Sequence, residues 1–193
     1  KSLNSSLFKS LFPEENPKVA LVGFVQCAFE SSMYIFVFLW TPILEESASP
    51  HHLPHGLVFA LFMISIMVGS NLFADTGKAG APEFLLRYAL AAAAACLAVP
   101  LFTNSHLLQL IAFCGFEACC GIYFPLQGSI RAKYVPGELR ATIMNLYRVG
   151  QNGACLFVSW EQLLFLLFLL DLCVIELFWL ILMFFIFFPT IFH

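Results

Sequence analysis

The feature that most constrains this chain is a series of apolar runs, each about as long as a helix that crosses a bilayer. The hydrocarbon core of a membrane is about 30 Å thick and takes about 20 apolar residues in a helix. Five runs meet this length, at residues 19–41, 56–74, 84–102, 106–128 and 141–160. We therefore expect an all-α membrane protein with a lipid bilayer around it.

Composition excludes the other broad classes of protein. Hydrophobic residues make up 61% of the chain and charged residues only 11%, whereas soluble domains carry about 25% charged residues. So few charges cannot cover a water-soluble surface, and the net charge of −3 offers no basic patch for a phosphate backbone. We expect no soluble domain, no disordered chain and no nucleic-acid partner.

The two ends of the chain differ from the apolar runs between them. Residues 1–18 are polar, lack an initiator methionine and resemble a cytoplasmic linker, so we expect a piece of a longer protein. Residues 161–193 form an atypical sixth hydrophobic segment in which eighteen of 33 residues are Leu or Phe. This segment is either a divergent helix or non-native read-through sequence, and we favour the second.

The basic residues predict the orientation of the chain in the membrane. Eight of the nine lie at alternate breaks between the runs: Lys1, Lys9, Lys18, Lys78, Arg87, Arg131, Lys133 and Arg140. Lys and Arg accumulate in cytoplasmic loops. We therefore expect a multi-pass protein of the cell membrane with a cytoplasmic N-terminus.

Three charged residues lie inside apolar runs, where each costs at least about 2.5–3.5 kcal/mol on insertion scales. They are Glu30, Glu117 and Arg148. One interpretation is that Arg148 pairs with a glutamate only to hold helices together. The other is that these residues line a transport path, in which a guanidinium would suit an oxyanion.

Neighbouring polar residues favour the transport path, because helical spacing places them in rows. Residues 26, 30 and 34 share one helix face, and residues 142, 145 and 148 share another. Three such faces turned toward one another would line a water-filled path. The substrate-path candidates are Gln26, Glu30, Tyr34, Glu117, Tyr123, Thr142, Asn145 and Arg148.

No motif in the sequence predicts an enzyme. The seven cysteines show no CxxC spacing, and no catalytic triad, phosphate loop or HExxH is present. His51, His52 and His55 share one proline-rich loop, where a solvated loop is a better interpretation than a metal site. We expect no enzymatic activity, no cofactor and no metal.

Four stretches carry a resemblance to a known family. They are Phe29-Glu30-Ser31 with residues 34–42, Gly69-Ser70 with Leu72, Glu117-Ala118-Cys119-Cys120-Gly121-Ile122-Tyr123-Phe124-Pro125, and residues 131–148. Together they resemble the eukaryotic molybdate-anion transporters of the major facilitator superfamily, over about residues 16–149.

This resemblance implies twelve helices in two six-helix halves that give alternating access to a central path. The chain would then be the C-terminal half, would take up molybdate, and would need the N-terminal half as a partner. By the same resemblance Glu30, Tyr34, Glu117, Asn145 and Arg148 would face the path. The alternative is a truncated membrane protein, or an assembly partner, that does not transport.

Overall fold

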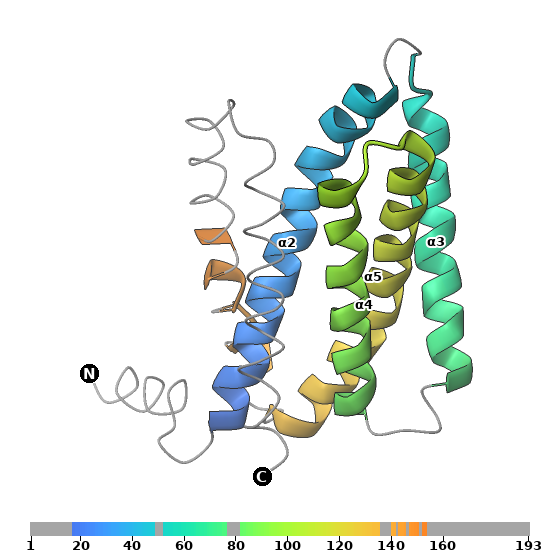
Figure 1. Ribbon diagram of the computed structural model, residues 1–193. Coiled ribbons are helices and arrows are strands. Elements are labelled where there is room, and N and C mark those ends of the chain that lie inside the picture. Colours follow the sequence, from blue (N-terminus) through green and yellow to red (C-terminus); the bar gives the residue numbers. More distant parts are fainter. Residues whose placement is uncertain are drawn as a thin grey trace.

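The computed structural model describes most of the chain up to residue 153. The described residues are 17–48, 52–76, 82–135, 140, 141, 143–145, 147–150, 152 and 153. Within them lie four long helices: α2 (Pro17–Ala48), α3 (His55–Thr76), α4 (Pro82–Phe102) and α5 (His106–Tyr134). Each is long and apolar enough to cross a membrane. Helices α2 and α4 run in one direction, and α3 and α5 run in the other (Figure 1).

All four helices extend beyond the apolar runs that the sequence suggested, and two of them do so by more than one turn. Helix α2 continues through Pro42 to Ala48, and α5 continues past Gly128 to Tyr134. Val135, which caps α5, has extended backbone angles, as expected for a residue that precedes a proline. The stop signal for α5 is therefore Pro136 in the sequence, and a single helical glycine does not end the helix.

The remaining expected segments lie partly or wholly outside the described residues. The described residues from 140 to 153 are helical and lie beside the first half of α2. Residues 1–16 and 154–193 are outside the described part, and with them most of the linker and the sixth segment. The part of the chain that the structure describes thus contains four candidate spans.

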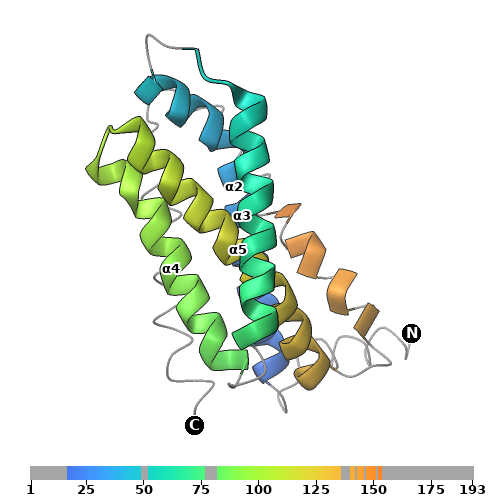
Figure 2. The same cartoon turned by 90° about the vertical axis from the view of Figure 1, so that its right-hand side faces the viewer.

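Helix α5 is the centre of the packing, because it contacts α2, α3 and α4 (Figure 2). Aromatic side chains fill its contact with α2. The rings of Phe36 and Phe113 lie 5.2 Å apart, and those of Phe29 and Tyr123 lie 4.0 Å apart. Stacked or edge-on aromatic pairs add about 0.5–1.5 kcal/mol beyond the area that they bury.

Two glycines allow α3 and α5 to touch through their backbones. A β-carbon on Gly69 would collide with the carbonyl of Ala118, and one on Gly121 would collide with the carbonyl of Ile66. Small residues allow such close approach between membrane helices. Gly121 also lies four residues before Pro125. Because proline has no amide hydrogen, the carbonyl oxygen of Gly121 receives no helical hydrogen bond from residue 125.

Polar contacts join α4 and α5 at one end of the bundle. The Lys133 ammonium lies 2.5 Å from Glu83 Oε1, and the Tyr134 hydroxyl donates to the same oxygen at 2.9 Å. The ammonium of Lys18 in α2 lies 6.0 Å from the centre of the Tyr134 ring. Basic residues of α2 and α5 thus gather at this end.

Helix α3 presents a broad apolar face with large exposed side chains. Its exposed large hydrophobic residues are Leu57, Phe59, Leu61, Met63, Ile64, Met67, Val68 and Leu72. An apolar face of this kind suits contact with lipid tails.

Candidate functional site

A row of three polar side chains runs along α2 from the interior of the bundle to its surface. This α2 row consists of Gln26, Glu30 and Tyr34, spaced four residues apart as the sequence suggested. Gln26 is 2% exposed, Glu30 is half-buried and Tyr34 is 50% exposed. The row therefore joins a buried polar group to an accessible surface.

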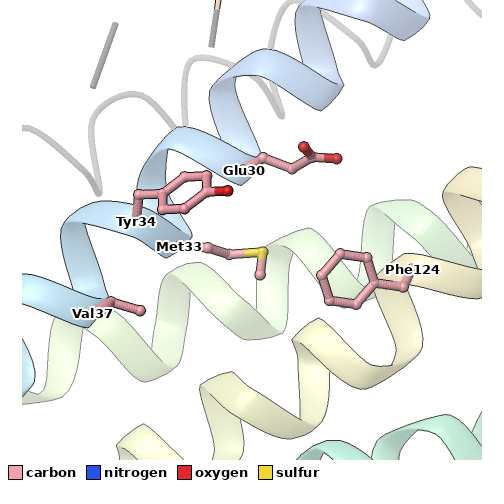
Figure 3. A pocket seen from close by; sticks show the side chains of 5 residues that line it. All are labelled: Glu30, Met33, Tyr34, Val37 and Phe124. Carbon is pink, nitrogen blue, oxygen red and sulfur yellow. The ribbon is translucent and has the colours of Figure 1, made fainter. Parts of the chain in front are cut away.

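The outer end of the α2 row borders a pocket of about 180 Å³. Glu30 and Tyr34 bring the polar atoms, while Met33, Val37 and Phe124 form its apolar wall (Figure 3). Sites for drug-sized ligands measure about 300–1,000 Å³. This pocket suits a ligand of only a few atoms.

A second polar row lies on α5 and faces the first. This α5 row consists of Tyr123, Gln127 and Arg131, again spaced four residues apart. Gln127 donates from Nε2 to the Val22 carbonyl oxygen at 3.3 Å, and Arg131 donates from Nη1 to Gln26 Oε1 at 3.4 Å. The two rows thus meet along the α2–α5 contact.

Two groups of the α5 row are buried without a hydrogen-bond partner among the described residues. They are the Tyr123 hydroxyl, on a side chain that is 0% exposed, and Gln127 Oε1. A buried polar group without a partner costs about 1–3 kcal/mol, so a ligand that supplies an acceptor to Tyr123 would gain stability there.

Sequence reasoning missed Gln127 and Arg131. It ended the fourth apolar run at Gly128 and counted Arg131 as a loop charge. The spacing of four from Tyr123 to Gln127 to Arg131 was the available signal, together with Pro136 as the helix stop.

Glu117 is buried, being 8% exposed, and lies one turn before Gly121 on α5. Gly121 marks the face of α5 that touches α3. Within the described part of the chain, Glu117 makes no hydrogen bond and no ion pair. Glu117 is therefore a buried acidic group that takes no part in the contact between Arg131 and Gln26.

The segment from 140 to 153 reaches α2 through Tyr147. The Tyr147 hydroxyl donates to the Val19 carbonyl oxygen at 2.6 Å, and the Cys27 thiol donates to the Tyr147 carbonyl oxygen at 3.0 Å. Asn145 and Arg148 are exposed, and no hydrogen bond between described residues joins either to the α2 row. Thr142 lies outside the described residues.

The described histidines and cysteines do not assemble into a metal site. His55 begins α3 and its Nε2 lies 3.0 Å from Glu45 Oε1, while His52 is exposed and His51 is outside the described part. No group of three His, Cys, Asp or Glu side chains suited to a metal occurs among the described residues. No disulfide joins any two of the described cysteines, which are Cys27, Cys96, Cys114, Cys119 and Cys120.

Several known proteins are similar to this chain in sequence. The molybdate-anion transporter of Danio rerio is 37% identical over 68% of this chain and 28% of its own length. Those of Xenopus tropicalis and Takifugu rubripes are 34% and 37% identical, over 70% and 68% of this chain. These matches confirm the resemblance, and the chain spans less than a third of each relative, 28–31% of its length.

A family model described as sugar transporters with 12 TM matches residues 9–120, which is more than half of the chain. The matched stretch contains α2, α3, α4 and the first half of α5. No solved structure matches the chain significantly. The chain therefore belongs to this sugar-transporter family of the major facilitator superfamily.

Proposed function

We propose that the chain is the C-terminal six-helix half of a secondary transporter that takes up molybdate by alternating access. The observation that carries this proposal is the polar contact between α2 and α5, where Arg131 in the last turn of α5 meets the buried Gln26 of α2. Polar groups within membrane spans are costly and mark substrate paths. The similarity to molybdate-anion transporters supplies the identity of the anion.

The proposed path follows the α2 row and the α5 side chains that face it. Gln26, Glu30 and Tyr34 would line one wall, and Tyr123 the other. The other candidates for this path are Glu117, Thr142, Asn145 and Arg148. The described contacts support the α2–α5 part of this path most directly, through Phe29 against Tyr123 and Gln26 against Arg131.

We also propose that the end of the bundle that carries the basic residues is cytoplasmic. Lys18, Arg131, Lys133 and Arg140 lie at or near the ends of helices on this side. The positive-inside rule then places the N-terminus in the cytoplasm and the α2–α3 connection outside. The surrounding membrane would be the cell membrane.

A path between two halves needs both of them, so the N-terminal six-helix half is the proposed partner. The test measures radiolabelled molybdate uptake in cells that express this chain alone, or this chain together with the N-terminal half of the Danio rerio relative. We expect uptake only when both halves are present at the cell surface. Unlabelled molybdate should compete with the label, and glucose should not.

The same experiment tests the competing hypothesis of a membrane protein that does not transport. Surface biotinylation, measured in parallel, shows whether each half reaches the membrane. Two halves that associate at the surface without molybdate uptake would contradict the proposed function. Uptake that glucose abolishes would instead favour a sugar as the substrate, in line with the description of the family.

A further inference from the structure

Arg131 differs from the other described basic residues in the groups that surround it. Its guanidinium donates from Nη1 to Gln26 Oε1 at 3.4 Å and lies 3.9 Å from Met144 Sδ. Both partners are neutral. The ion pairs between described residues join Glu45 with His55 and Glu83 with Lys133, and neither includes Arg131.

The neighbouring basic residues have other roles. The charge of Lys133 is balanced by Glu83, at 2.5 Å. Arg140 donates to the carbonyl oxygen of Val135 at 3.3 Å, and Arg148 is exposed. Among the described residues, Arg131 is thus the basic side chain that meets the α2 row.

The two acceptors that Arg131 contacts, Gln26 and Met144, hold its guanidinium weakly. A distance of 3.4 Å between nitrogen and oxygen exceeds the usual 2.7–3.2 Å of a strong hydrogen bond. A thioether sulfur is a weak acceptor. Guanidinium groups bind oxyanions through two parallel N–H donors, and such charge-assisted bonds are about twice as strong as neutral ones. An oxyanion would therefore displace Gln26 or Met144 as the acceptor.

A second donor lies on the same face of α5. The Tyr123 hydroxyl is buried and has no acceptor among the described residues. Gln127 lies between the two side chains, one turn from each. The α5 row thus offers two donors to a small anion, the Arg131 guanidinium and the Tyr123 hydroxyl, which has no partner among the described residues. The anion would contact both at once or pass from one to the other.

From this arrangement we infer that Arg131 contacts the transported anion, that Gln26 positions its guanidinium, and that Tyr123 is the next donor along α5. The inference rests on the proposed function and names Arg131 as its anion-binding residue. The ligand class is a tetrahedral oxyanion dianion, which includes molybdate, tungstate and sulfate. Arg131 binds the anion through its charge and its N–H donors, and no covalent bond in the anion is broken.

Binding to the complete chain, expressed together with the N-terminal half of the Danio rerio relative and extracted with its surrounding lipid, tests this inference. Equilibrium dialysis measures radiolabelled molybdate, with tungstate and sulfate as competitors. We expect Arg131→Gln to weaken binding at least tenfold, Arg131→Lys to weaken it less, and Tyr123→Phe to weaken it several-fold. Arg140→Gln removes an equal charge from an exposed residue and should leave binding unchanged.

Protection of arginine from chemical modification can be measured in the wild-type protein, so this test does not depend on the folding of a variant. Phenylglyoxal modifies arginine side chains, and mass spectrometry reads the extent of modification at each one. Molybdate should slow the modification of Arg131 in the wild-type protein and leave that of Arg140 unchanged. Equal modification of Arg131 with and without molybdate would overturn the inference, even if Arg131→Gln were too unstable to purify.

The outcomes separate this inference from the proposed function. Wild-type protein that binds molybdate, together with a folded Arg131→Gln variant that binds it equally well, would contradict only the role of Arg131. Loss of binding in Arg148→Gln but not in Arg131→Gln would assign the contact to Arg148 instead. Wild-type protein that binds no oxyanion would contradict the proposed function itself.

Discussion

The hydroxyl of Tyr147 donates a hydrogen bond to the backbone carbonyl oxygen of Val19 at 2.6 Å, although 128 positions of sequence separate the two residues. This bond fixes the segment after α5 to the first turns of α2. Tyr147→Phe should therefore lower the free energy of unfolding by about 1 kcal/mol, the usual value of a buried hydrogen bond. Thermal unfolding in detergent, with Tyr88→Phe as the exposed control, measures the difference.

Gly121→Ala should destabilise the contact of α3 with α5. Its new β-carbon would collide with the Ile66 carbonyl, and backbone atoms cannot move aside as a side-chain tip does, so we expect a loss of about 1–3 kcal/mol. Gly128→Ala, in the same helix, meets no atom within 4 Å and should stabilise the helix by about 0.5–1 kcal/mol. Equal effects of the two substitutions would contradict the close contact.

Glu83→Gln should loosen the end of the bundle that carries the basic residues. Glu83 is buried and accepts from both Lys133 and Tyr134, so neutralising it removes one ion pair and weakens a second hydrogen bond. We expect a lower unfolding temperature, whereas Glu46→Gln on the exposed end of α2 should change it little. A double-mutant cycle of Glu83→Gln with Lys133→Gln should show coupling between the two residues, and independent effects would contradict it.

Glu30→Gln should strengthen molybdate binding several-fold at neutral pH. The Glu30 carboxylate lines the pocket next to Phe124, the α5 neighbour of Tyr123, so a negative charge at Glu30 would repel a dianion held at the α5 row. Equilibrium dialysis of Glu30→Gln and Glu46→Gln measures the change against a matched control. Weaker binding by Glu30→Gln would mean that Glu30 contributes a favourable contact instead.

Glycosylation acceptors inserted into the connections would test the orientation in the membrane. A site inserted beside His52 should be glycosylated, because we place the α2–α3 connection outside. A site inserted after Val135 should not, because that end carries Arg131, Lys133 and Arg140. The reverse pattern would contradict the proposed topology.

The helical spacing of the α2 row was visible in the sequence, whereas Gln127 and Arg131 of the α5 row were not identified from it, for a physical reason. Gln26, Glu30 and Tyr34 stand out because they interrupt a long apolar run at helical spacing. Arg131 lies in the last turn of α5, where basic residues also occur simply because they interact favourably with the helix dipole. Charge alone does not distinguish these two cases, and only the position of Gln26 on another helix does.

The close contact of α3 with α5 illustrates the same limit. Gly69 and Gly121 are visible as small residues in apolar runs, yet so are Gly115 and Gly128, and Gly128 has open space around it. Which glycine meets a neighbouring backbone depends on the relative rotation of two helices. That rotation is set by packing across the whole bundle, including the aromatic contact of Phe36 with Phe113.

Pro125 gives α5 a point at which the helix can bend. The carbonyl oxygen of Gly121 receives no amide hydrogen from residue 125, so the helix can bend there without breaking a backbone hydrogen bond. The part before the joint is held against α3 at Gly121, and the part after it carries Arg131 about 9 Å further along the axis. A tilt of about 10° at Pro125 would move the Arg131 backbone by roughly 1.6 Å over that length, enough to change the 3.4 Å distance from Arg131 Nη1 to Gln26 Oε1.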